Sequence, residues 1–262
     1  MYRSLCTALA AVVIAGLSAD RLAAQTVDEV IAKNLQARGG VEKLKAMNSA
    51  RVTGDVMQGS AKIHVVTYAK RPNLMRREME AAIPPELAAR AGRAGMPAPS
   101  GTLKSVTGFD GTNVWVMNPG TGNLPQAITG AQAEVAKQDA DFDSVLLDYK
   151  AKGHTIELVG TENINGKPAH HLKITRKIGV VQHYYLDVAT GLETRTSSTV
   201  EQGPSKAEVV MDLSNYQNVD GLAMPFTMRQ SINGKPVAEV TISKWEVNVP
   251  IEDELFRMPA KK

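Results

Sequence analysis

The pentapeptide Ile-Asn-Gly-Lys-Pro occurs twice, at Ile164–Pro168 and again at Ile232–Pro236. Each copy lies between runs of strand-forming residues. An Asn-Gly pair in that setting strongly favours a two-residue hairpin, because both of its positions require a positive φ. These two hairpins commit the C-terminal half of the chain to antiparallel pairing of neighbouring strands. The repeat is too short to indicate a duplicated domain.

Strand patterns extend over most of the chain. From Ser49 the period is two: apolar and polar residues alternate from Ala50 to Val56 and again from Lys62 to Val65, with a turn at Gln58-Gly59-Ser60. Leu74–Ala82 continues the same meander, and Val114, Trp115 and Val116 also suit a strand. The pattern after Gly153 contains strands only, over Thr155–Val159, Ala169–Thr175, Val181–Asp187, Leu192–Val200, Lys206–Tyr216, Phe226–Ile232 and Val237–Val247. With about eleven strands and few helices, we expect a mainly β fold in which a strongly bent antiparallel sheet curls into a half-open barrel.

Two helices are expected before the first strand. Thr26–Arg38 is amphipathic, with Thr26 and Glu29 in a capping-box pattern, and Gly39-Gly40 ends it. A shorter helix, Val41–Met47, follows with Leu44 on its buried side.

Two further helices are expected within residues 130–150. Gly130–Gln138 and Asp141–Tyr149 carry apolar side chains among acidic ones, and Gly153 stops the pattern. Helices inserted in a β meander must bury their apolar face on the sheet or on a partner. From the residues alone, they either form a lid or fill the core.

Residues 1–24 have the pattern of a secretion signal. Arg3 provides the positive start, Ala8–Leu17 is an apolar run too short to span a bilayer, and cleavage is expected near Ala24.

Residues 25–262 then form one domain, interrupted at residues 83–100 by a mobile insertion rich in Pro, Ala and Gly, in which Glu86–Arg90 suits one or two helical turns. Cys6 is the only cysteine, so the mature chain has no disulfide, thiolate-bound zinc or cysteine nucleophile.

Charge and motifs exclude several classes of function. The formal net charge of +3 is too small to indicate a nucleic-acid partner. The sequence has no Gly-x-Ser-x-Gly elbow, Gly-rich phosphate loop or His-Glu-x-x-His motif. His170 and His171 point to opposite faces of a strand, so at most one of them can join His183 in a metal site, and we favour surface or hairpin histidines over a metal site. The acidic residues Asp139, Asp141, Asp143 and Asp148 are interpreted as a solvated face.

Two segments then carry a resemblance. Lys70-Arg71-Pro72-Asn73 is a corner between strands, because Pro72 has no amide hydrogen and holds Arg71 extended. Asp110-Gly111 is followed by Val114-Trp115 and by a second corner at Asn118-Pro119. In this order, and together with Phe256-x-x-Pro259, they resemble the outer-membrane lipoprotein-sorting family of LolA and LolB, which is a half-open β-barrel covered by helices.

The resemblance implies a role and partners. It implies a soluble periplasmic carrier that holds acyl chains of lipoproteins or other envelope lipids in an apolar cavity. An inner-membrane donor and an outer-membrane acceptor would be its partner proteins. We expect a monomer with no cofactor, no metal and no enzymatic activity.

The resemblance also implies a site. In the family, an arginine at the Lys-Arg-Pro-Asn corner bonds to lid carbonyls, and Arg71 matches it. The expected ligand-binding and latch residues are Arg71, Trp115, Met75, Met117, Phe142 and Leu146. Methionines suit a cavity for flexible chains, although ordinary core filling explains them as well. For Arg71, the alternative is a solvent-facing cation at a strand corner.

Two other classes of function stay open. A lipoprotein-sensing regulator of envelope stress uses the same half-barrel fused to a second domain, for which the sequence shows no candidate segment. An enzyme acting on envelope lipids would need a catalytic group, and the sequence offers none.

Overall fold

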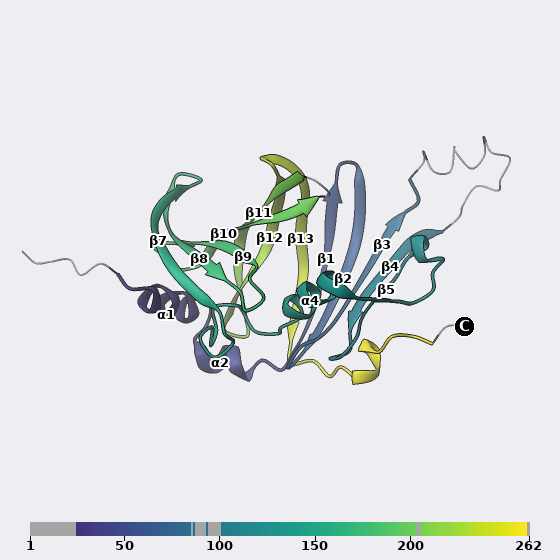
Figure 1. Ribbon diagram of the computed structural model, residues 1–262, viewed down its shortest axis with the longest axis horizontal. Coiled ribbons are helices and arrows are strands. Elements are labelled where there is room, and N and C mark those ends of the chain that lie inside the picture. Colours follow the sequence, from purple (N-terminus) through teal and green to yellow (C-terminus); the bar gives the residue numbers. More distant parts are fainter. Residues whose placement is uncertain (1–24, 85, 87–92, 94–100, 203–204, 261–262) are drawn as a thin grey trace, which may run out of the picture.

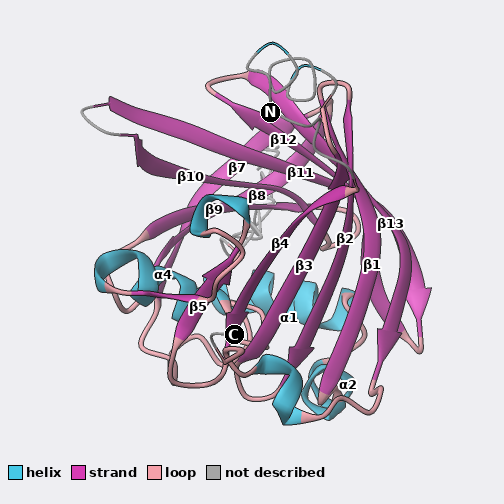
Figure 2. Cartoon of the chain, turned by 90° about the vertical axis from the view of Figure 1, so that its right-hand side faces the viewer, coloured by secondary structure: helices cyan, strands magenta, loops and turns pink. Residues whose placement is uncertain are grey.

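One large antiparallel sheet dominates the computed structural model, which describes residues 25–84, 86, 93, 101–202 and 205–260. Its thirteen strands lie in the order β6-β5-β4-β3-β2-β1-β13-β12-β11-β10-β9-β8-β7. The outermost strands β6 and β7 are not paired with each other, so the sheet curves into a half-barrel without closing (Figures 1 and 2). The expected fold class is confirmed.

The strands are β1 (Ser49–Gln58), β2 (Ala61–Lys70), β3 (Leu74–Ala82), β4 (Thr102–Phe109), β5 (Val114–Met117), β6 (Gln126–Ile128), β7 (Thr155–Ile164), β8 (Lys167–Thr175), β9 (Val181–Asp187), β10 (Glu193–Gln202), β11 (Ser205–Val219), β12 (Leu222–Ile232) and β13 (Lys235–Val247). Two of them, β4 and β6, are additional to the expected set. Strand β6 has only three residues, and β4 mixes Lys, Ser, Thr and Gly into its alternation, so neither shows a strong apolar period.

Turn chemistry fixes the register as expected. Asn165 and Gly166 have φ of 53° and 85°, and Asn233 and Gly234 have φ of 48° and 73°. Each pair therefore connects its strands as a two-residue hairpin, with Ile164 opposite Lys167 in the first.

The helices cover the concave face of the sheet. They are α1 (Val27–Ala37), α2 (Val41–Ala46) and α4 (Gly130–Asp139). Two short 3-10 turns, η1 (Pro119–Thr121) and η2 (Asp253–Phe256), lie elsewhere in the chain. The capping box of α1 is present, since Glu29 N donates to Thr26 Oγ1 and Thr26 N donates to Glu29 Oε2.

The helix expected at Asp141–Tyr149 is wrong: this stretch is a series of turns. Asp141 Oδ1 accepts a hydrogen bond from Asp143 N at 3.1 Å, and Ser144 Oγ accepts one from Leu146 N at 3.3 Å. Such side-chain bonds to nearby amides compete with helical hydrogen bonds. Asp148, with φ of 54°, also interrupts a helical path. We call residues 140–152 the lid segment.

Two apolar clusters hold the cover to the sheet. The larger joins α1, α2 and the lid segment to β7–β9 and β12, and contains Val30, Leu44, Leu146, Leu172 and Leu186. The smaller seats the alanines of α4 on the opposite part of the sheet, at Phe109 and Val114. Cover and sheet therefore meet at two separate places on the concave face.

The convex face has a cover of its own near β3–β5. Trp115 is fully buried and donates from Nε1 to the carbonyl of Phe256 at 2.9 Å. Phe256 is also fully buried, and Arg76 donates to the neighbouring Leu255 carbonyl. The C-terminal segment is thus bound to the outside of the sheet.

Some expectations lie outside the described residues. These are the secretion signal at residues 1–24, most of the insertion at residues 83–100 and most of the helical turn at Glu86–Arg90. Among the described helices, none combines the length and the apolar character that a bilayer crossing requires.

Gly108 allows Trp115 to lie flat on β4, because a Cβ added at Gly108 would overlap the indole ring. We expect Gly108→Ala to lower the free energy of unfolding by about 1–3 kcal/mol, the usual cost of overpacking. Trp115→Phe removes the overlapping ring, so the double variant should lose less than the sum of the single losses. Urea unfolding measures all three; additivity within about 0.5 kcal/mol would contradict this reading.

Candidate functional site

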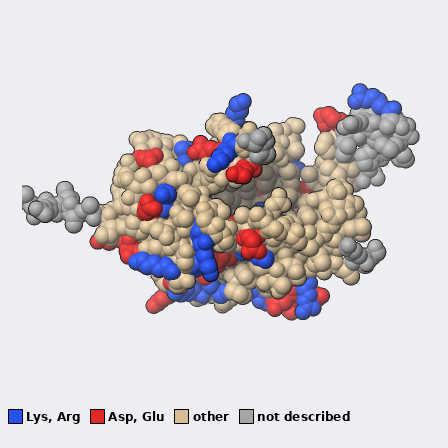
Figure 3. Space-filling view, in the orientation of Figure 1, with Lys and Arg blue, Asp and Glu red and all other residues tan. Residues whose placement is uncertain are grey.

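A cavity lies between the two apolar clusters, on the concave face of the sheet. Its volume is about 400 Å³, and α1, α2, the lid segment and the central strands line it. Apolar side chains from the strands form one wall, among them Val52, Ala69, Met75, Leu213 and Trp245. This volume falls in the range of about 300–1,000 Å³ that is typical of small-molecule sites. Figure 3 shows the corresponding face hollowed in its upper half.

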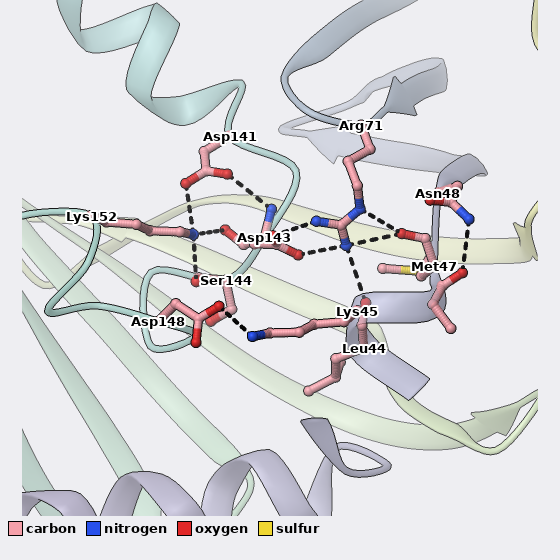
Figure 4. Close-up of polar contacts among 11 residues, drawn as sticks. Leu44, Lys45, Met47, Asn48, Arg71, Asp141, Asp143, Ser144, Asp148 and Lys152 are labelled. Carbon is pink, nitrogen blue, oxygen red and sulfur yellow. Dashed lines mark hydrogen bonds and ion pairs between the residues drawn. The ribbon is translucent and has the colours of Figure 1, made fainter. Parts of the chain in front are cut away.

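Arg71 joins the lid segment to α2 at one side of this cavity (Figure 4). Its guanidinium donates to both oxygens of Asp143, at 2.5 and 2.9 Å. It also donates to the carbonyls of Met47, at 3.0 and 3.1 Å, and of Leu44, at 3.3 Å. The guanidinium lies over the ring of Phe142, 5.1 Å from its centroid.

The sequence explains why this guanidinium can reach two elements. Lys70-Arg71-Pro72 forms the corner between β2 and β3, directly beside the end of α2, where Arg71 N donates to Asn48 O. The carbonyls at a helix C-terminus lack intrahelical partners and carry a partial negative charge, so a cation is favoured there. A planar guanidinium can meet these carbonyls and a carboxylate at once.

Further contacts hold the lid segment. Lys152 Nζ lies 2.7 Å from Asp141 Oδ2 and also donates to the carbonyls of Asp143 and Ser144. Lys45 of α2 lies 2.6 Å from Asp148 (Figure 4). The backbone adds one bond, from Phe142 N to Pro72 O.

The acidic residues of this region are solvated only in part: the side chains of Asp139 and Asp148 are 56% and 50% exposed, as interpreted, whereas that of Asp143 is 18% exposed, and for Asp143 the interpretation is corrected. Each of the four carboxylates has a basic partner, in the pairs Asp139–Arg176, Asp141–Lys152, Asp143–Arg71 and Asp148–Lys45. The pairs differ in burial: the side chains of Arg71 and Asp143 are 26% and 18% exposed, whereas those of Lys45 and Asp148 are 48% and 50% exposed. Water therefore screens the charges of the Arg71–Asp143 pair less than those of the Lys45–Asp148 pair.

A polar patch interrupts the apolar wall near α1. Arg38 pairs with Glu193, and Tyr216 donates to the carbonyl and carboxylate of the same residue. Burial, together with the charge of Glu193, raises the pKa of the cavity-lining Tyr184 to about 12. Arg38, Glu193 and Tyr216 satisfy one another's hydrogen bonds, so they do not present a poised acid or base.

The predicted site residues divide into three groups. Arg71 contacts the lid segment, and Met75 and Phe142 line the cavity. Leu146 is buried in the larger apolar cluster and anchors the lid segment. The placement of Trp115 and Met117 in the cavity is corrected, because both lie on the convex face. The register aligns Trp115 with Gly108 and Gly108 with Arg76, whose neighbours Met75 and Arg77 face the cavity on the other side of the sheet. Met117 is two residues after Trp115 and shares its face.

Most residues that line the cavity were not predicted, and three of them matter for the argument. These are Asp143, Met47 and Arg77. For Arg77, the strand period gives a signal: it shares a face with Met75, two residues earlier. No comparable signal marks Asp143, whose position follows from turns.

His170 and His171 are buried within β8, so the expectation of surface or hairpin histidines is wrong for them. His171 forms a pair with His183 on the convex face. His171 Nε2 lies 2.7 Å from His183 Nδ1, and His171 Nδ1 lies 2.5 Å from Glu162 Oε1. His170 is on the other face, near Lys33. In the described part of the chain, no group of three or more His, Cys, Asp or Glu side chains is arranged to hold a metal ion.

A larger groove, of about 670 Å³, lies outside the sheet over β9–β13. Charged pairs line much of it, among them Arg195–Asp212 and Arg229–Glu239. Because it has no helical cover and few apolar walls, we place the candidate site in the concave cavity.

The fold is similar to that of proteins of known structure. A DUF1329 family protein from Desulfovibrio piger matches with a TM-score of 0.56 at 14% identity, over 89% of this chain and 98% of that one. A LolA superfamily protein from Nitrosomonas europaea gives 0.53 at 12% identity, over 89% and 98%. A putative outer-membrane lipoprotein-sorting protein domain from Vibrio parahaemolyticus gives 0.52 at 12% identity, over 86% and 97%.

The chain thus has the LolA-like fold that the corner motifs led us to expect. At these identities, the similarity concerns the fold. No family model matches the sequence, and no curated protein matches it.

Asp143→Asn should loosen the lid segment, because it removes the charge that faces Arg71 while keeping the side-chain shape. We expect a loss of about 1–3 kcal/mol in the free energy of unfolding and faster hydrogen exchange at residues 141–149. Asp148→Asn is the matched control: its exposed pair with Lys45 should contribute about 1 kcal/mol or less. Equal effects of the two variants would contradict a special role for the Arg71 pair.

Stability should fall on mild acidification. Burial lowers the pKa of His183 below its ordinary value of 6.5, and the charges of His171 and Lys173 lower it further. Burial and Lys33 likewise lower the pKa of His170. Near and below pH 6.5, the unfolded chain then binds more protons than the folded one. The contribution of these histidines to the free energy of unfolding is therefore complete above that pH and is lost as the pH falls through their folded pKa values.

Urea unfolding between about pH 5 and 8 measures this slope. His183→Asn should flatten it in part, with His170 and His154, whose pKa values burial also lowers, supplying the remainder. An unchanged slope would show that His183 does not contribute.

Proposed function

We propose that this protein is a soluble periplasmic carrier, which binds acyl chains of lipoproteins or other envelope lipids in the concave cavity. The observation that supports this most directly is the cavity of about 400 Å³ between an apolar sheet wall and a lid segment held by Arg71. The LolA-like fold and the signal pattern of residues 1–24 agree with it.

A carrier must release what it binds. Burial of an acyl chain gains roughly 0.8 kcal/mol for each methylene, so a fixed apolar cavity would hold several chains very tightly. A lid that must open for the ligand offsets part of that gain, because the closed empty state has its own bonds to lose. In this proposal those bonds are the contacts of Arg71 with Asp143 and with the carbonyls of α2.

Ligand entry would then separate the lid segment from α2. The contacts that must break are local and polar: the Arg71–Asp143 pair and the exposed Lys45–Asp148 pair. Leu146 and Leu147 are almost fully buried in the larger cluster and would stay in place as the anchor. Motion is therefore expected at Phe142 and Asp143, which lie at the edge of the cavity.

Mass spectrometry of the gently purified protein tests the proposal. We expect co-purifying lipid with one or more acyl chains, bound without chemical change. Protein that carries no lipid and takes up none from vesicles would contradict a carrier. Conversion of the lipid would indicate an enzyme instead, and capture of a signalling protein in a periplasmic pull-down would favour a regulator.

Arg71→Leu tests the latch separately. The closed empty state loses its bonds to Asp143 and Met47, so ligand affinity should rise and release to acceptor vesicles should slow, each by about tenfold or more. Circular dichroism should show the sheet unchanged. Lys45→Met, which removes only the exposed pair with Asp148, is the matched control and should change transfer far less than Arg71→Leu, because an exposed pair contributes little. Normal transfer by Arg71→Leu would remove the latch from the proposal.

A further inference from the structure

Arg77 places a cation inside the apolar cavity. It lies on β3, two residues after Met75, and both side chains line the cavity. The sheet register aligns Arg77 with Thr67 of β2, Thr67 with Val52 of β1, and Val52 with Trp245 of β13. One row across four strands therefore leads from a guanidinium to an indole ring.

The guanidinium of Arg77 differs from the other charges at the cavity. Four carboxylates line the cavity, and each has a basic partner, in the pairs Asp139–Arg176, Asp141–Lys152, Asp143–Arg71 and Glu193–Arg38. For Arg77, within the described residues, there is no carboxylate at ion-pair distance, and its one side-chain hydrogen bond is to Thr67 Oγ1 at 3.3 Å.

The surroundings of Arg77 are those of a recess. Its side chain is exposed, yet desolvation by the surrounding protein lowers its pKa, against a smaller opposite effect of Asp139. Both observations hold together if the guanidinium extends into a hollow that water reaches but protein surrounds. An arginine remains charged in such a place, so it attracts an anion more strongly there than on an open surface.

We propose that Arg77 binds the carboxylate or phosphate head of an anionic amphiphile, whose acyl chain lies along the apolar row at Val52 and Trp245. This inference rests on the proposed function and narrows its ligand class. A guanidinium suits both head groups, because its planar donors match two oxygens at once.

The dimensions agree with one chain in the closed state. Neighbouring strands are about 4.8 Å apart, so the row from Arg77 to Trp245 spans about 14 Å. The volume of about 400 Å³ is near the lower end for ligand sites. A single-chain anion therefore fits the closed cavity better than cargo with three chains.

The test compares two probes with the same chain: pyrene-labelled palmitic acid and the matching pyrene-labelled alcohol. Fluorescence titration of the full chain should show the acid bound about tenfold to a hundredfold more tightly, as expected for hydrogen bonds to a charged group. Arg77→Gln should remove this preference and leave the affinity for the alcohol unchanged. Arg77→Lys should restore part of it.

Arg229→Gln is the matched control, because it removes a positive charge outside the cavity. It should keep the preference for the acid. Palmityl phosphate should bind in the same way as the acid, and inorganic phosphate alone should not displace it, because the chain supplies most of the affinity.

The outcomes separate the two proposals. Equal binding of acid and alcohol by the unaltered protein, or a preference that survives Arg77→Gln, would overturn the role of Arg77 while leaving the carrier proposal intact. Binding of neither probe would overturn both. Displacement by inorganic phosphate alone would show an anion site without a place for the chain.

Discussion

A half-open sheet cannot bury its own concave face, and the rest of this structure depends on how that face is covered. Helices α1 and α4 cover its two ends through separate apolar clusters. Between them the cover is held by polar contacts, chiefly those of Arg71 with Asp143 and with the carbonyls at the end of α2. Opening an apolar cluster would cost about 1.5–3 kcal/mol for each side chain that it exposes, whereas such polar contacts exchange with water at modest cost. The middle of the cover is thus the part that can move.

The sequence predicted the sheet because its signals are local. Asn165-Gly166 and Asn233-Gly234 specify their turns whatever surrounds them, and the apolar period then sets each strand. Prediction was poorer where two local signals compete. The residues at 141–149 have a helical pattern, but the side chains of Asp141 and Ser144 bond to nearby amides and turn the chain.

The site was predicted in part for the same reason. Arg71 is marked by its corner, whereas its partner Asp143 belongs to turns that have no period. Trp115 was assigned to the wrong face. A strand of four residues does not reveal which of its faces is concave, and the answer came from Gly108, whose missing side chain makes room for the indole. A glycine opposite a tryptophan is a signal that sequence analysis can use.

The pairing of β1 with β13 has a consequence for how the molecule reaches its final form. This ladder joins residues near 50 to residues near 247, and without it the order of strands would break into two separate ribbons. Contacts between such distant residues form late, since a long loop must close before they give any stability. The sheet of such a chain stays incomplete until almost the whole chain is available for folding. Until then, β1 and β13 expose unpaired edges that other polypeptides can join.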